Sequence, residues 1–323
     1  MKKSNLIIII CIIVLIICIA SIVIVKISNN NDNSKEDKTQ LSQYYDAESL
    51  GKLKGTEVIG HVVSNYKSGN DENIEWKILY AGNIEDNSNE LIEPRIYLVA
   101  SDYVPAKDIP KEIFNVSSGD DYKFYFNDDN KQYADDLESV KEETLRNLLK
   151  AFYDKVKSAP RKSSSNFSNT AAMLDQSKWN GFKDTNGYAE FIIGGPTLEL
   201  YYQAYNKMYY TNKHANASST NGYFVKSAYS SSSVTTVDED DKLEQDNFFV
   251  IKNTDKAKGW WLASPADSVD DKKGTLGVSY SGTIINGGKN MILGVRPVAI
   301  LDKNVKMQKQ DDGTFKIIDN EQN

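Results

Sequence analysis

The C-terminal part of the fold follows from two stretches of sequence, WWLASP at residues 260–265 and GVRPV at residues 294–298. Both are rich in the aromatic and β-branched residues that are typical of strands. Successive side chains of a strand point to opposite faces, so one of the two indoles should face the core and the other the rim. Pro265 is predicted to end the first strand, because proline has no N–H to donate to a neighbouring strand.

Arg296 is the one charged residue within these two stretches. We expect it to be a buried or half-buried structural guanidinium that donates hydrogen bonds to loop carbonyls or to a carboxylate. Ligand recognition is the second interpretation of the same residue.

The segment between the two stretches, GVSYSGTIINGGKN at 277–290, alternates glycines with Tyr, Ser and Asn. This composition is typical of adaptable binding loops, and equally of a hairpin turn, so both interpretations stay open. The candidate ligand-binding residues of this region are Trp260, Trp261, Tyr280, Ser281, Asn286, Asn290 and Arg296.

Short apolar runs elsewhere predict further strands. These runs lie at 58–63, 74–80, 96–100, 248–251, 276–280, 295–301 and 315–318. In IEWKILY (74–80) the alternation predicts one buried face and one mostly wet face.

Helical spacing of apolar residues predicts three helices, the first from Asp135 or Asp136 to Pro160 and a short second one from Asn169 or Thr170 to Leu174. The third should run from Leu198 to about Tyr209, with its tyrosine stripe in the core. The turn before it, GGPT at 194–197, could accept an anion at the helix N-terminus, but a turn with an N-cap is the favoured interpretation. Mixed strands and peripheral helices together predict an α+β fold.

The N-terminal segment Leu6–Val25 has twenty residues without charge, Pro or Gly, which is the length that crosses a bilayer as a helix. Lys2 and Lys3 favour a cytoplasmic N-terminus. We therefore expect residues 1–26 to be a cytoplasmic stub and anchor in the cell membrane, 27–43 a polar stalk, and 44–323 an extracellular domain. A cleaved signal peptide with a secreted product is the alternative.

Charge and cysteine placement exclude several classes of protein. Both cysteines, Cys11 and Cys18, lie in the predicted anchor, so disulfide scaffolds, cysteine zinc sites and thiol nucleophiles are excluded from the rest. After Lys3 the chain has 36 Lys and Arg against 45 Asp and Glu, a net charge of −9. This balance argues against nucleic acid as a partner.

Metal and catalytic signals are weak. The acidic runs at 238–241, 270–271 and 311–312 lack the alternating ligands of a calcium loop, so no cofactor is expected and calcium has no support. Four carboxylates outside these runs, Glu75, Asp184, Glu190 and Glu199, could pair for hydrolysis, but nothing in their spacing joins two of them. His61 and His214 have no visible partner.

Several motifs together resemble a known group. They are 76–80, 96–104, 171–174 with Trp179, 193–199, 260–265 and 294–298. This pattern resembles a family of surface or secreted proteins of low-G+C Gram-positive bacteria whose C-terminal domain, of unknown function, carries Trp-Leu-x-Ser-Pro and Gly-Val-Arg-Pro. More distantly, residues 165–303 resemble the C-type lectin-like fold shared by formylglycine-generating enzymes and the variable proteins of diversity-generating retroelements.

The resemblance implies a C-type lectin-like module at the C-terminal end. It does not carry over the cysteine-dependent formylglycine activity, because the predicted extracellular part has no cysteine. The sugar-binding signatures Glu-Pro-Asn and Trp-Asn-Asp are also absent, since Trp179-Asn180 is followed by Gly181. Calcium-dependent sugar binding is therefore not implied.

The first hypothesis for function is a single-pass, membrane-anchored extracellular protein that binds or adheres to a protein or a glycan. The second is a cell-envelope hydrolase that uses a carboxylate pair. The third is a structural envelope protein without a small ligand.

Overall fold

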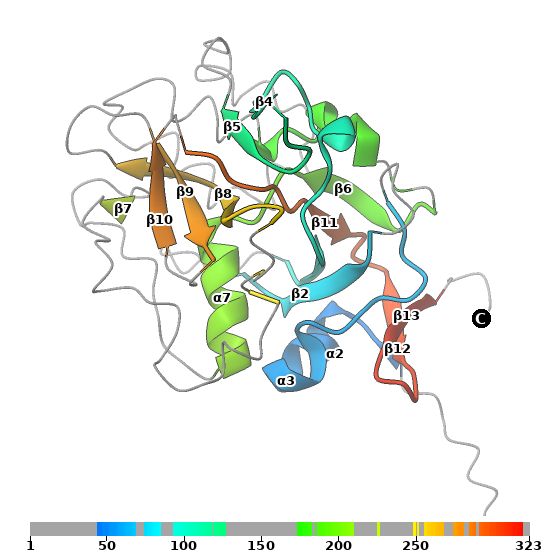
Figure 1. The fold of residues 1–323 in the computed structure, drawn as a ribbon. Coiled ribbons are helices and arrows are strands. Elements are labelled where there is room, and N and C mark those ends of the chain that lie inside the picture. The colour runs from blue at the N-terminus through cyan, green and yellow to red at the C-terminus, as the bar shows by residue number, and fades with distance from the viewer. Residues whose placement is uncertain are drawn as a thin grey trace, which may run out of the picture. The chain divides into compact units, whose positions relative to one another are not determined.

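The structure is a computed structural model of the chain, and its described residues form a mixed α+β fold made mostly of strands, with few helices (Figure 1). This confirms the predicted α+β class. The described residues all belong to one compact unit, Gln43–Asn323. They are residues 44–68, 74–84, 93–117, 119–126, 173–182, 184, 186–209, 225–226, 248–249, 251, 255–267, 274–280, 284–288 and 291–318.

A four-stranded antiparallel sheet forms the centre of the hydrophobic core. Its order is β2-β3-β11-β6. The bounds are β2 Trp76–Gly82, β3 Arg95–Ala100, β11 Val298–Leu301 and β6 Ala189–Ile193. Every residue of β3 and β11 is buried, as expected for short apolar runs covered on both faces. The strands predicted at 74–80 and 96–100 are confirmed, with small shifts of their bounds.

The alternation predicted for β2 is correct only in its first half. Trp76 and Ile78 are buried and Lys77 is partly exposed, as expected. The register with β3 then shifts between Ile78 and Tyr80. Because an irregular residue exchanges the two faces of a strand, Leu79 is buried and Tyr80 is partly exposed.

The second four-stranded sheet has the order β10-β9-β8-β7. Its strands are β7 Val225–Lys226, β8 Gly259–Asp267, β9 Gly274–Ser279 and β10 Ile284–Gly288. The prediction that Pro265 ends the strand is wrong, because β8 continues to Asp267. The β8–β9 register shifts between Trp261 and Pro265, and such an irregular stretch is where a strand tolerates proline.

A two-residue bridge extends this sheet to the hairpin of β4 (Phe114–Val116) and β5 (Phe124–Phe126). Phe124 and Leu293 exchange both backbone hydrogen bonds, at 2.9 and 3.0 Å. On its other side Gly294 donates to the Gly259 carbonyl at 2.8 Å and accepts from the Trp261 N–H at 2.9 Å. The strands β4 and β5, residues 293–294, and β8, β9 and β10 therefore follow one another in a continuous ladder.

The chain from 293 to 301 connects this ladder to the central sheet. After Gly294, the carbonyls of Val295 and Pro297 accept hydrogen bonds from Val104 and Ala100 at 3.1 Å each. Residues 298–301 then form β11 between β3 and β6. The predicted strand at 295–301 is thus a regular strand only from Val298, and its first part is the crossover between the two sheets.

The helix α7 (Leu198–Tyr209) confirms the prediction for this segment. The tyrosines Tyr201, Tyr202 and Tyr205 are buried, so the tyrosine stripe is core, as predicted. Figure 1 shows α7 beside the strands β8 and β9. Of the predicted helix at 169–174 only Met173 and Leu174 are described, and both are helical. The predicted helix at 135–160 lies outside the described residues, as does the loop predicted at 227–247.

Two predicted strands are wrong. The segment at 58–63 begins with the end of the short helix α3 (Gly55–Val58), and Val62 and Val63 form only isolated bridges. Phe248 and Phe249 form a turn instead of the strand predicted at 248–251. Their carbonyls point to side chains rather than to a neighbouring strand, because they accept from Arg296 and Trp260.

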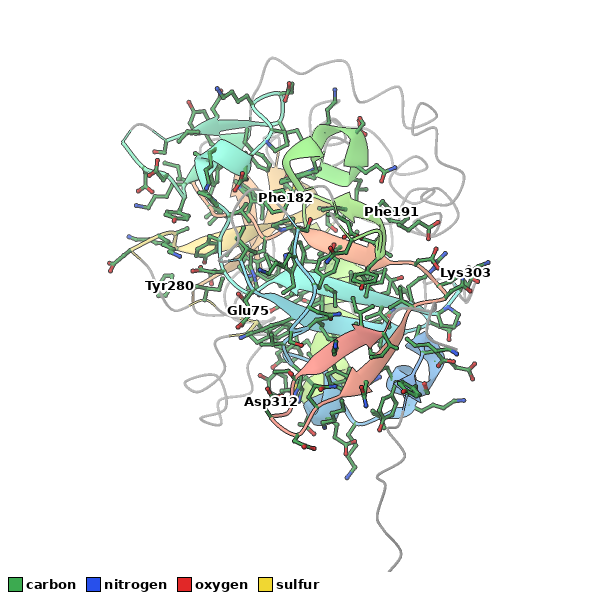
Figure 2. All side chains as sticks on the ribbon, turned by 90° about the vertical axis from the view of Figure 1, so that its right-hand side faces the viewer. Glu75, Phe182, Phe191, Tyr280, Lys303 and Asp312 are labelled. Carbon is green, nitrogen blue, oxygen red and sulfur yellow. The ribbon has the colours of Figure 1, made fainter. Side chains whose placement is uncertain are left out.

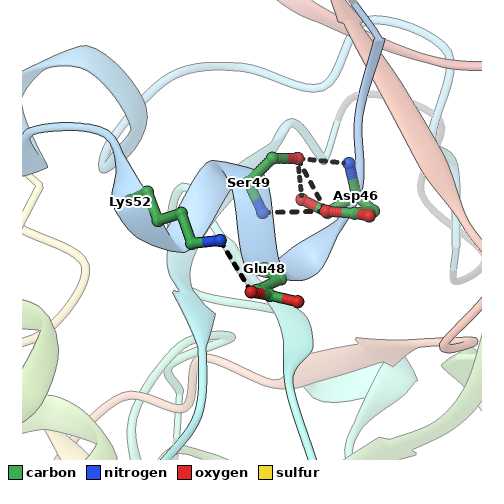
Figure 3. Close-up of polar contacts among 4 residues, drawn as sticks. All are labelled: Asp46, Glu48, Ser49 and Lys52. Carbon is green, nitrogen blue, oxygen red and sulfur yellow. Dashed lines mark hydrogen bonds and ion pairs between the residues drawn. The ribbon is translucent and has the colours of Figure 1, made fainter.

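Another short helix, α2 (Ala47–Lys52), follows the first described strand, β1 (Tyr44–Tyr45). Figure 3 shows its capping box, in which Ser49 N–H donates to the Asp46 carboxylate and the Asp46 N–H donates to Ser49 Oγ, both at 2.8 Å. Hydrogen bonds from the Ser49 hydroxyl and N–H lower the pKa of Asp46. This cap defines where α2 begins.

The two ends of the described chain are joined in one sheet of order β1-β12-β13, with β12 at Lys306–Lys309 and β13 at Phe315–Ile318. The predicted strand at 315–318 is confirmed. The side chain of Asn65 binds both backbone groups of Ile317: its Nδ2 donates to the carbonyl and its Oδ1 accepts from the N–H, each at 2.8 Å. Asn65 thus replaces a neighbouring strand for one residue of β13.

In the part of the chain that the structure describes, no helix is long and apolar enough to cross a membrane. The predicted anchor at 6–25 and the predicted stalk at 27–43 lie outside the described residues.

Asn65→Ala should lower the free energy of unfolding by about 1–3 kcal/mol, because both backbone groups of Ile317 lose their partner. Urea denaturation of the full chain, followed by the fluorescence of its buried tryptophans, measures this. Gln310→Ala is the control, since the Gln310 amide makes only a local bond of 3.3 Å to the Gln308 carbonyl. An equal loss in both variants would contradict the role of the Asn65 side chain as the hydrogen-bond partner of Ile317.

Alkaline pH should destabilise the fold steeply. Burial raises the pKa of Tyr66, Tyr97 and Tyr103 above the usual 10. The unfolded chain therefore loses these protons above pH 10 while the folded chain keeps them, so stability falls as pH rises, by about 1.4 kcal/mol per pH unit for each tyrosine.

Urea titrations between pH 9 and 11 test this slope, which Tyr97→Phe should reduce by one tyrosine's share. The core variant Ile78→Val, which removes no titrating group, should lower stability without changing the slope. An unchanged slope in Tyr97→Phe would refute the explanation.

Candidate functional site

Arg296 is a buried structural residue, as the sequence predicts. Its Nε donates to the Ala100 carbonyl at 2.9 Å and its Nη1 to the Phe248 carbonyl at 2.7 Å. The guanidinium carbon lies 4.8 Å from the ring centroid of Trp260 and 5.6 Å from that of Phe248. A guanidinium stays charged at any pH a protein tolerates, so these carbonyl and ring contacts offset the loss of water.

Both Trp260 and Trp261 are buried, so the predicted rim position for one of the two is wrong. Trp260 Nε1 donates to the Phe249 carbonyl at 3.3 Å, and its ring packs on Tyr201 of α7. On the other face of β8, Trp261 Nε1 donates to the Phe124 carbonyl at 3.1 Å. Both faces of the strand are covered, because α7 lies over one and β5 reaches the other.

Among the predicted site residues whose side chains the structure describes, Tyr280 lies at the surface. It follows the last residue of β9, is 55% exposed and points outward in Figure 2. Asn286 lies on β10 opposite Leu276, and only its backbone is described. Ser281 and Asn290 lie outside the described residues. The structure thus brings Tyr280 to the surface, whereas Trp260, Trp261 and Arg296 are buried.

The backbone register identifies the neighbours of Tyr280. Its N–H donates to the Lys258 carbonyl at 2.9 Å, which continues the Gly259–Ser279 pair by one residue. The parallel bridge between Trp260 and Gly294 aligns the chain before Gly294 with the chain before Trp260, so Ile292 and Lys258, each two residues before the bridge, lie at the same end of the ladder. The antiparallel bridge between Phe124 and Leu293 places residue 292 beside residue 125.

Directly opposed residues of neighbouring strands point to the same face of a sheet. Five residues from five segments gather at this end of the ladder, and we call them the terminal strip. In order across the ladder they are Asn115, Tyr125, Ile292, Lys258 and Tyr280. Neighbouring strands are about 4.8 Å apart, so the four from Tyr125 to Tyr280 span about 14 Å.

The terminal strip is open to solvent. Ile292 is 40% exposed, Lys258 is exposed, and Tyr125 and Asn115 are partly exposed. Sequence reasoning found only Tyr280 of the five. The other four come from four segments between residues 115 and 292, and no local pattern marks them, because only the register of the folded ladder joins them.

Two glycines next to the strip, Gly259 and Gly294, allow the backbone to pack closely against its neighbours. Gly259 has φ +151°, and a Cβ there would lie 2.2 Å from the Val278 carbonyl oxygen. At Gly294 a Cβ would lie 2.3 Å from the ring of Tyr103. Both positions therefore require glycine for the close approach of their neighbours.

Two lysines that lie near the terminal strip, Lys123 and Lys256, are paired with carboxylates. Lys256 contacts Asp102 and lies 4.8 Å from the ring centroid of Tyr122. Lys123 contacts Asp120 and thereby lowers the pKa of that carboxyl group. Among the described residues Lys258 has no carboxylate within ion-pair distance, so it is the lysine of this region whose charge faces solvent.

The other sequence candidates have structural roles where they are described. Thr197 Oγ1 accepts from Leu200 N–H at 3.3 Å and Ser264 Oγ accepts from Leu198 N–H at 2.9 Å. These bonds confirm the turn and N-cap interpretation of GGPT. His61 is placed between two carbonyls, with Nδ1 2.7 Å from that of Gly313 and Nε2 3.2 Å from that of Thr56.

Three of the four candidate carboxylates also hold backbone or basic groups. Glu190 forms an ion pair of 2.7 Å with the buried Arg95, and Glu75 one of 3.4 Å with Lys77. Asp184 accepts from the N–H of Asn186 at 2.9 Å. The described residues contain no group of three His, Cys, Asp or Glu placed to hold a metal, while the acidic runs at 238–241 and 270–271 and His214 lie outside the described residues.

Comparison of the chain with protein-family models, with curated proteins and with solved structures gave no match.

Arg296→Lys should lower the free energy of unfolding by about 2–4 kcal/mol, because an ammonium cannot donate to both carbonyls and cover the Trp260 ring at once. Urea denaturation measures the loss, and Trp fluorescence reports the change beside Trp260. Lys303→Ala, which removes an exposed pair 3.8 Å from Glu93, should change stability by less than about 0.5 kcal/mol. Equal stability of Arg296→Lys and the natural chain would refute the structural role.

Proposed function

We propose that the chain is a membrane-anchored extracellular protein that binds or adheres to another molecule, a protein or a glycan, through the terminal strip. The observation that carries this proposal is the strip itself, with Tyr280 and Ile292 55% and 40% exposed at the end of a well-packed ladder. Contiguous exposed apolar surface is typical of interaction sites, and Ile292 and Tyr280 expose apolar atoms on either side of Lys258 in the order across the ladder. The anchor is the apolar segment 6–25, with the N-terminus in the cytoplasm.

The C-type lectin-like module at 165–303 belongs to the same proposal. The order of the parts supports it: a tryptophan-bearing strand, β8, is followed by the hairpin β9–β10 and by the Gly-Val-Arg segment. Residues 293–294 of that segment pair beside β8. In this arrangement the Gly-Val-Arg segment fixes the end of β8 at which the strip lies.

Tyr280→Ala should weaken binding by about tenfold or more, because the strip loses its most exposed aromatic contact. The assay applies the full chain in detergent micelles to arrays of immobilised glycans and surface proteins, with and without Ca²⁺. Tyr44→Ala is the matched control, since Tyr44 is equally exposed, at 53%, but belongs to β1.

Binding that survives Tyr280→Ala, or falls equally in both variants, would contradict a site at the strip. The absence of any ligand on both arrays would count against a binding function.

A further inference from the structure

The centre of the terminal strip is apolar. Ile292, 40% exposed, comes between Tyr125 and Lys258 in the order of the segments across the ladder. A branched aliphatic side chain gains free energy when it is covered by apolar atoms, but it has no hydrogen-bonding group and no flat face. This favours an apolar side chain of a partner protein at the position of Ile292.

The cation of the strip lies beside this apolar centre. Lys258 is exposed, whereas the nearby Lys123 and Lys256 are already paired with Asp120 and Asp102. A carboxylate of a partner that approaches Lys258 gains a charge-assisted hydrogen bond without breaking an ion pair described in the structure. The charge of the strip therefore complements an acidic group.

The residues next to the strip on the ladder are buried and well packed. The row of residues next to it on the ladder includes Phe124, Leu293 and Gly259, and all three are buried. The Trp261 indole N–H donates a hydrogen bond to the Phe124 carbonyl at 3.1 Å. A surface that is already ordered loses little conformational entropy on binding, so a few contacts suffice for a short ligand.

Its length suits a short peptide. The 14 Å from Tyr125 to Tyr280 correspond to about four residues of extended chain at about 3.4 Å each. Such a segment places one side chain on Ile292 and a neighbouring one on Lys258. The tyrosines at both ends offer apolar rings and hydroxyl groups to the rest of the segment.

We infer that the terminal strip binds a short segment of a partner protein in which an apolar side chain is followed closely by Asp or Glu. Ile292 and the two tyrosines contact the apolar side chain, and Lys258 binds the carboxylate. This inference rests on the proposed binding function and names its ligand class.

A phage-displayed library of random peptides, selected on the full chain in detergent micelles, provides the probes. Enriched sequences should combine an acidic residue with an adjacent apolar one. Synthetic versions of these peptides should bind Lys258→Glu and Ile292→Asp about tenfold or more weakly than the natural chain in fluorescence anisotropy.

Two control variants separate the strip from the rest of the surface. Val116→Asp changes a side chain that is similarly exposed, at 39%, but lies one residue along β4 from Asn115 and so on the opposite face of the ladder. Lys306→Glu reverses an exposed lysine on β12. Both should leave peptide affinity within about twofold of the natural chain.

A charge exchange makes the test specific. A peptide whose acidic residue is replaced by Lys should lose affinity for the natural chain and recover at least part of it with Lys258→Glu. Enriched peptides without an acidic residue, or affinities that the four variants do not separate, would overturn the inference.

The arrays distinguish the possible failures. Glycan binding that Lys258→Glu and Ile292→Asp abolish, without any selected peptide, would retain the binding function and replace the peptide by a sugar. Protein or glycan binding that no strip variant changes would retain the function and overturn the inference. The absence of a ligand on the arrays and in the library would overturn both.

Discussion

The burial of one guanidinium, that of Arg296, is the constraint on which the rest of the structure depends. A charge that cannot be neutralised must be hydrogen-bonded when it leaves water. Arg296 meets this demand with the carbonyls of Ala100 and Phe248 and with the face of Trp260. These three groups belong to the end of β3, a turn and β8, so a single side chain fixes the place where the two sheets meet.

The terminal strip is a consequence of that junction. Arg296 lies two residues after Gly294, whose backbone joins β8 to the bridge that leads to β5. The junction sets where residues 293–294 lie between β5 and β8. It therefore also sets which residues of these segments come to lie at the end of the ladder. Ile292 thereby comes between Tyr125 and Lys258 in the order of the segments across the ladder, although 167 residues separate it from Tyr125 in the chain.

Local sequence patterns predicted what local physics decides. The apolar run at 96–100, the helix from Leu198 to Tyr209 and the structural role of Arg296 each follow from a few neighbouring residues. The failures arise from contact with distant segments and from irregular residues within strands. Trp261 is buried because β5 reaches it, and β2 changes its faces at one irregular residue. The strip could not be predicted, because no sequence pattern contains the register of five segments.

The charge of the chain constrains how the proposed binding of an acidic segment by the strip would work. With 36 basic residues against 45 acidic ones after Lys3, the chain repels an acidic partner at distances beyond direct contact. Salt at physiological strength screens this repulsion over about 8 Å, whereas the contact between Lys258 and a carboxylate acts at hydrogen-bond distance. Long-range attraction therefore contributes nothing to capture, and affinity has to arise from contacts made after encounter. In the proposed site, affinity would therefore come mainly from apolar contact with Ile292. Lys258 would provide selectivity for apolar segments that also carry a carboxylate.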